Sequence, residues 1–117
     1  MKSHLEIQVN TRPAGKAQVV DVDGEIDLYT SQVLQKCLLN LMEQGQKYLV
    51  VDLEDVGYLD STGLGILMNT SGQLQDQGGS LAIVCTNERV LRIFELIGML
   101  DSFRVFPSEA EALASFD

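Results

Sequence analysis

Residues 48–53 constrain the fold more than any other part of the chain. They form a nearly continuous apolar run with several β-branched side chains, a pattern typical of a central strand covered on both faces. A few residues later, the polar stretch Asp60-Ser61-Thr62 and the glycines that follow it are typical of the start of a helix. We therefore expect an α/β architecture in which a buried strand leads into a helix.

Upstream of this strand, the apolar pattern predicts a hairpin followed by a helix. Apolar and polar residues alternate over residues 5–9, residues 12–15 supply a turn, and residues 17–22 form a second apolar run. Thr30 or Ser31 is placed to cap the helix. The apolar face expected for that helix consists of Val33, Leu34, Cys37, Leu38, Leu41 and Met42.

Downstream of the central strand, helices and strands alternate. We expect a helix over about residues 61–77, a strand over 81–84, a helix capped by Asn87 and a short strand over 103–106. Residues 108–111 fit a capping box, which predicts a last helix. The buried faces expected are Leu64, Leu67, Met68, Ser71 and Leu74 on the helix after residue 60, and Val90, Leu91, Phe94 and Ile97 on the helix after Asn87.

The predicted order, β-β-α-β-α-β-α-β-α, implies a single α/β domain over residues 1–117. Its sheet is mixed, because an N-terminal antiparallel hairpin at one edge is followed by parallel strands joined by right-handed crossovers. The helices pack on the sheet. A chain of this length buries enough surface to fold without a disulfide or a metal.

The net charge of −9 restricts the partners of the chain. Such an acidic protein repels phosphate backbones and anionic lipids, so we expect no direct nucleic acid contact and no membrane contact. Cys37 and Cys85 lie far apart within apolar patterns, which favours buried reduced thiols. No apolar stretch follows Lys2, and we therefore expect a cytoplasmic protein. We also expect a monomer or weak dimer.

The sequence holds no pattern that favours enzymatic activity. It contains neither a P-loop nor a dinucleotide fingerprint, so we expect no cofactor. The lone histidine, His4, has no evident partner for a catalytic triad. We therefore expect a protein that binds other proteins and is not an enzyme.

Ser61 has the most informative surroundings of any polar residue. Asp60, Ser61 and Thr62 are all good N-caps, and on local chemistry alone the stretch does no more than start a helix. Yet one side-chain oxygen is enough for a cap. Gly63 and Gly65, in the first helical turns, also lower the stability of the helix by about 0.5–1 kcal/mol each relative to alanine. Glycines beside a serine allow another protein to approach it. A phosphate on Ser61 would lie at the positive end of the helix dipole, near open amide groups, so we expect the fold to tolerate it.

Two motifs, Gly24-Glu25-Ile26-Asp27 and Asp60-Ser61-Thr62-Gly63-Leu64-Gly65, resemble those of the STAS domain, anti-sigma factor antagonist family. Together with the strand order, the resemblance covers essentially the whole chain. It implies that the unphosphorylated protein binds an anti-sigma factor serine kinase and releases a sigma factor, that phosphorylation of Ser61 ends the binding, and that a serine phosphatase restores it. It also implies a partner-binding surface formed by Asp23, Gly24, Asp60, Thr62, Gly63 and Leu64.

Two other interpretations remain, and a third is disfavoured. The chain could be a STAS scaffold module in a multiprotein signalling assembly, or an unrelated α/β binding protein in which Ser61 is only a cap. A response-regulator receiver is the third, because Asp21, Asp23 and Asp52 imitate its acidic set. Receivers, however, begin with an isolated strand and helix, and they need a lysine late in the fold, whereas every lysine here lies in the first half.

Overall fold

The computed structural model describes residues 7–96 and 103–117, and within them the chain forms five strands and four helices. In chain order the elements are β1 (Ile7–Ala14), β2 (Ala17–Ile26), α1 (Ser31–Glu43), β3 (Tyr48–Leu59), α2 (Ser61–Asp76), β4 (Ser80–Val84), α3 (Glu88–Leu96), β5 (Arg104–Phe106) and α4 (Glu109–Ala114). This is the predicted order. His4, Leu5 and Ile97 lie outside the described residues. None of the described helices is long and apolar enough to cross a lipid bilayer.

The five described strands form one mixed sheet in the order β1-β2-β3-β4-β5. β1 and β2 pair antiparallel as the predicted hairpin, and β2 to β5 run parallel. The hairpin is longer than expected, because Arg12 and Pro13 remain in β1 and only Gly15 and Lys16 form the turn. Proline is tolerated there because β1 is an edge strand.

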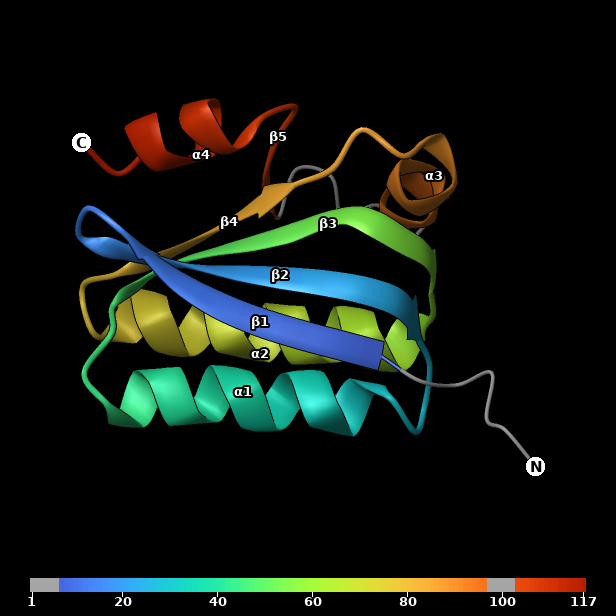
Figure 1. Cartoon of the computed structure of the whole chain (residues 1–117), viewed down its shortest axis with the longest axis horizontal. Coiled ribbons are helices and arrows are strands. Elements are labelled where there is room, and N and C mark those ends of the chain that lie inside the picture. Colours follow the sequence, from blue (N-terminus) through green and yellow to red (C-terminus); the bar gives the residue numbers. More distant parts are fainter. Residues whose placement is uncertain (1–6, 97–102) are drawn as a thin grey trace.

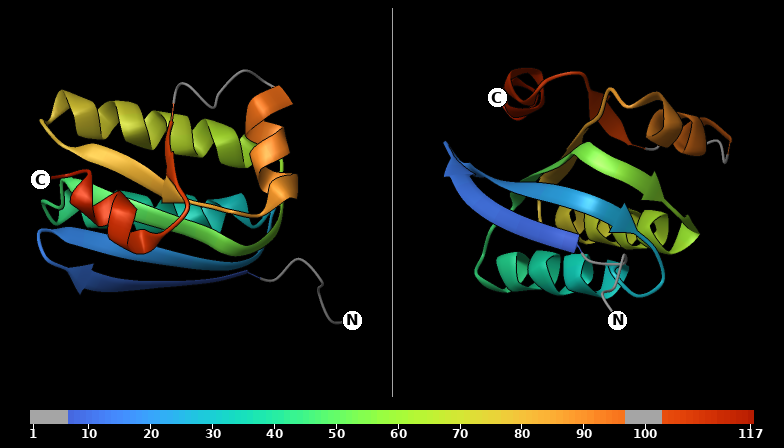
Figure 2. Two further views of the ribbon diagram at one scale, coloured as in Figure 1. Left: turned by 90° about the horizontal axis from the view of Figure 1, so that it is seen from above. Right: turned by 45° about the vertical axis from the view of Figure 1, so that its right-hand side comes forward.

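Helices cover both faces of the sheet (Figure 1). α1 and α2 lie side by side on one face, and α3 and α4 lie on the other (Figures 1 and 2). Leu49, Val50 and Val51 of β3 have no exposed surface, which confirms a central strand covered on both faces. The smaller of two buried clusters lies under α4 and consists of Ala17, Val19, Val50, Ala82, Val84, Ala112 and Phe116.

β2 and β3 continue past their predicted ends at residues 22 and 53. Their pairing contains two register shifts, and Gly24, beside the second, has a φ of +127°, a conformation that favours glycine. These irregularities keep the polar residues of both strands in the sheet. As a result the two strands end together, with Ile26 paired to Leu59.

Two residues predicted for the core are exposed. Val33 on α1 and Met68 on α2 face solvent. The buried face of α2 includes Ile66 and Thr70 instead, and the Thr70 hydroxyl donates to the Ile66 carbonyl at 2.8 Å. An apolar stripe read from the sequence does not show this rotation, because a buried threonine that bonds its own helix behaves as a core residue.

Asn87 and Ser108 cap α3 and α4 as predicted. The Asn87 Oδ1 accepts a hydrogen bond from the Arg89 amide at 2.9 Å. The Ser108 hydroxyl oxygen accepts one from the Glu111 amide at 3.2 Å and lies 3.3 Å from the Glu111 carboxylate. Both helices on this face of the sheet therefore begin where the sequence indicates.

α2 packs against the ends of β2 and β3 at a distance that only glycine allows. A Cβ atom on Gly63 would lie 2.4 Å from Leu59 Cδ1 and 2.6 Å from Ile26 Cγ2. A Cβ atom on Gly65 would have no neighbour within 4 Å. A Cβ atom at position 63 would therefore have to displace Leu59 and Ile26, whereas one at position 65 would displace nothing.

Gly63→Ala should lower the free energy of unfolding, because the added methyl group overpacks the contact with Leu59 and Ile26. The expected loss is about 1–3 kcal/mol, measured by urea denaturation. Gly65→Ala is the matched control on the same helix, and it should raise the free energy of unfolding by about 0.5–1 kcal/mol. Equal stabilities of the two variants would contradict the close packing at Gly63.

Candidate functional site

The β2–α1 and β3–α2 junctions lie side by side at one edge of the sheet (Figure 1). Ile26 and Leu59 are register partners, and the amide of Asp60 donates to the carbonyl of Ile26 at 3.1 Å. α1 and α2 both begin at this edge, so their N-termini point the same way (Figure 1). Residues 26–30 and 59–63 therefore form one continuous region, which we call the junction surface.

Asp60 caps α2. Its Oδ1 atom accepts hydrogen bonds from the amides of Thr62 at 2.9 Å and Gly63 at 3.2 Å. The expectation that these amides stay open near Ser61 is therefore wrong. Ser61 itself is exposed, and its hydroxyl bonds to none of the residues that the structure describes. Because Asp60 does the capping, the Ser61 hydroxyl is left available for chemistry.

Asp27 has the same function at the start of α1. Its Oδ1 atom accepts hydrogen bonds from the amides of Tyr29 and Thr30, both at 2.9 Å. In return the Asp27 amide donates to the Thr30 hydroxyl oxygen at 2.8 Å, which completes a capping box. Thr30 is at the N-cap position of α1, as predicted, but its side chain caps no helix amide and instead bonds to the Asp27 amide and the Glu25 carbonyl. The spacing Asp-x-x-Thr is the sequence signal that could have identified this box.

Four of the predicted partner-binding residues belong to the β3–α2 junction, at different depths. Asp60 and Thr62 are half-buried in the junction surface. Gly63 and Leu64 are buried, and their packing fixes the position of the helix start that carries Ser61. The idea that both glycines open the surface to a partner therefore applies to the position of Gly65 and not to that of Gly63.

The other two predicted residues, Asp23 and Gly24, lie near the end of β2. Asp23 is exposed and is the register partner of Asp55 on β3, which is also exposed. No lysine or arginine occurs between residues 16 and 36 or between residues 47 and 89. The two chain segments that build this edge therefore carry acidic charges alone.

Similarity to known proteins agrees with this geometry. Residues 6–112 match the STAS domain family. The chain belongs to the STAS domain family. It is 39% identical over 97 residues to the anti-sigma-B factor antagonist of Bacillus subtilis, covering 83% of this chain and 88% of the relative. It is 34% identical over 101 residues to the anti-sigma-B factor antagonist of Staphylococcus aureus, covering 86% and 94%.

A solved structure extends the similarity to three dimensions. An anti-sigma factor antagonist from Mycobacterium paratuberculosis matches this STAS domain with a TM-score of 0.90 at 27% identity, covering 99% of this chain and 98% of that one. This match confirms the predicted fold, a single α/β domain with a mixed sheet, an N-terminal hairpin and helices packed on the sheet. Together with the family match over residues 6–112, it confirms the predicted family.

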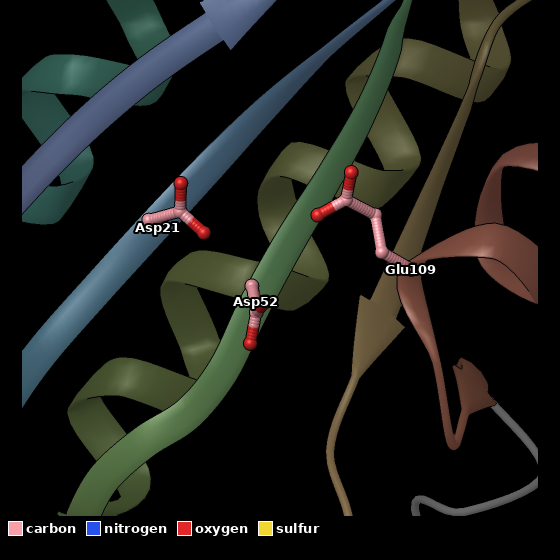
Figure 3. A group of neighbouring side chains, drawn as sticks. All are labelled: Asp21, Asp52 and Glu109. Atoms are coloured by element: carbon pink, nitrogen blue, oxygen red, sulfur yellow. The ribbon is translucent and has the colours of Figure 1, made fainter. Parts of the chain in front are cut away.

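The STAS domain holds a second charged group under α4 (Figure 3). Asp21 of β2, Asp52 of β3 and Glu109 of α4 have carboxylate oxygens within 4.8 Å of one another. Arg12 on β1 neutralises two of them: Nε donates to Asp21 at 2.9 Å, and the guanidinium also pairs with both oxygens of Glu109. This pairing lowers the pKa of Glu109. Arg12 therefore links α4 to the β1–β2 hairpin through these ion pairs.

Asp52 is the member of this group that Arg12 does not reach. Its burial raises its pKa, and the nearby charges of Asp21 and Glu109 raise it further, although a hydrogen bond from the Glu54 amide at 2.9 Å acts in the opposite direction. Asp52 pairs with Asp21 in the middle of β3, away from the end of the strand. The acidic set that imitates a receiver is therefore not assembled at the junction surface.

Asp52→Asn should stabilise the domain at neutral pH. A raised pKa means that folding favours the protonated carboxyl group, so ionised Asp52 destabilises the folded state above that pKa. The penalty shrinks as the pH falls through the raised pKa, and it disappears below the ordinary pKa of an aspartate, because Asp52 is then protonated in both states. Thermal unfolding should show a higher Tm at neutral pH and a shrinking difference in acid. Glu95→Gln, at an exposed site, is the control; a pH-independent gain for Asp52→Asn would contradict this explanation.

Proposed function

We propose that this chain is an anti-sigma factor antagonist that acts by partner switching. In this proposal the unphosphorylated form binds an anti-sigma factor serine kinase and frees the sigma factor that the kinase holds. Phosphorylation of Ser61 ends the binding, and a serine phosphatase restores it. The names of the curated relatives support the antagonist role. The observation that carries the role of Ser61 is its exposed hydroxyl, without a partner among the described residues, next to the Asp60 cap.

Phosphorylation would transfer the γ-phosphoryl group of ATP to the Ser61 oxygen, and the hydroxyl proton would leave. The kinase would bind the ATP, because this chain contains no P-loop. Ser61 is the first residue of α2 and is exposed, so its oxygen is accessible without unfolding of the helix. Hydrolysis of the phosphate ester by the phosphatase would return the original hydroxyl.

A phosphate would add about −1.5 to −2 charges to an edge that already holds Asp23, Asp27 and Asp60. Because Asp60 already occupies the amides of Thr62 and Gly63, the start of α2 does not absorb this charge. The phosphate therefore acts on the partner that docks against the edge. In this proposal Asp23, Gly24, Asp60 and Thr62 belong to the contact surface, and Gly63 and Leu64 hold Ser61 in place.

Ser61→Asp should weaken binding to the anti-sigma factor kinase by more than about tenfold, or about 1.4 kcal/mol, measured by calorimetry. Ser61→Asn has nearly the same shape without the charge and should bind much more tightly than Ser61→Asp. Both variants should keep the Tm of the wild type, since the Ser61 hydroxyl has no described partner.

Two results would contradict the proposal. Equal binding by the wild type and Ser61→Asp would refute the charge mechanism. Incubation with ATP and each serine kinase of this class encoded in the same genome, followed by mass spectrometry, should place a phosphate on Ser61. If none of these kinases modifies Ser61, the partner-switching function fails.

A further inference from the structure

The start of α1 reverses the usual distribution of apolar and polar side chains. Leu28, Tyr29 and Val33 are 56%, 67% and 48% exposed. The polar neighbours Thr30 and Ser31 are buried, at 4% and 1% exposure. We call the three apolar residues the apolar ridge. Single exposed apolar residues are common on proteins, but three of them close together in one turn and the first turn of a helix make a candidate binding surface.

Hydrogen bonds hold the apolar ridge in this orientation. The Thr30 hydroxyl donates to the Glu25 carbonyl at 2.6 Å, and the Ser31 hydroxyl donates to the Leu28 carbonyl at 3.1 Å. The Asp27 carboxylate accepts the amide of Tyr29. The backbone that carries Leu28 and Tyr29 is therefore fixed before any partner arrives. A backbone that is already fixed does not have to be ordered on binding, which favours affinity.

The turn that carries Leu28 and Tyr29 follows β2 next to the β3–α2 junction that carries Ser61. The bond from the Asp60 amide to the Ile26 carbonyl holds the two caps, Asp27 and Asp60, at the same level of adjacent strands. Leu28 follows the first cap as Ser61 follows the second. A protein that reaches the Ser61 hydroxyl therefore also meets the apolar ridge.

Charge indicates what kind of surface would cover the apolar ridge. Asp23, Glu25 and Asp55 are exposed on the ends of β2 and β3 next to the junctions. Three of the described cations are instead engaged with α4 or the residues after it: Arg12, Lys16 and Arg104. The complementary surface is an apolar hollow bordered by lysine or arginine side chains.

We propose that the apolar ridge is the anchor by which the anti-sigma factor kinase holds this chain, with Leu28 and Tyr29 inserted into an apolar hollow bordered by basic side chains. The inference rests on the proposed function and adds a division of roles to it. The apolar ridge supplies the affinity, and phosphorylation of Ser61 decides whether the kinase stays bound. A phosphate on Ser61 would lie at the margin of the buried anchor, where binding would remove part of its hydration at a cost in free energy.

The double variant Leu28→Ser/Tyr29→Ser tests this anchor. Calorimetry against each anti-sigma factor kinase encoded in the same genome should show binding weaker by roughly tenfold or more. The Tm should stay that of the wild type, because both side chains are exposed and the bonds that hold the turn use the backbone at these positions. Leu39→Ser is the matched control on α1, at a residue 42% exposed, and should bind like the wild type.

The outcomes separate this inference from the function on which it rests. Equal binding by the double variant and the wild type overturns the anchor but leaves kinase binding and Ser61 phosphorylation intact. If the wild type binds none of the kinases, the proposed function fails and the anchor fails with it. If sedimentation shows that the wild type self-associates through these residues while kinase affinity is unchanged in the variant, the apolar ridge joins two copies of this chain and the proposal is wrong.

Discussion

The hydrogen bond from the Asp60 amide to the Ile26 carbonyl is the contact on which the functional edge depends. It continues the pairing of β2 and β3 beyond Leu59 and fixes Asp27 and Asp60 at the same level. Each aspartate then starts a helix, and the close approach of Gly63 presses α2 onto the same strand ends. The positions of Ser61 and the apolar ridge are therefore fixed by two strands, β2 and β3, and two helices, α1 and α2.

Charge is distributed unevenly between the two ends of the molecule. Arg12, Lys16 and Arg104 are paired with α4 or with residues after it, toward the end opposite the junctions (Figure 1). The segments that form the junction surface contain no lysine or arginine. The junction surface itself is therefore acidic, although α3, which carries Arg89 and Arg92, lies at the same end of the sheet (Figure 1). A phosphate there increases an existing negative potential, and the fold does not need to change for a partner to be repelled.

The order of elements could be predicted because apolar periodicity and capping residues agree along the chain, and the motif around Ser61 was recognisable from its residues alone. The full lengths of β2 and β3 could not, because the irregular pairing at Gly24 keeps polar residues in the sheet. Periodicity also placed Val33 in the core, since an apolar stripe does not reveal that Asp27 bonds the turn before α1 and buries Thr30. The requirement for Gly63 depends on Ile26, a neighbour from another strand.

Amide hydrogen exchange at Thr62 and Gly63 tests most directly whether phosphorylation adds charge to an unchanged junction. NMR would compare the unphosphorylated protein with the protein phosphorylated on Ser61, using the amides of the central strand as an internal reference. If Asp60 keeps both amides, their protection should be the same in the two forms. A marked loss of protection at Thr62 and Gly63, with the central strand unaffected, would show that the phosphate displaces Asp60 and would contradict a purely electrostatic switch.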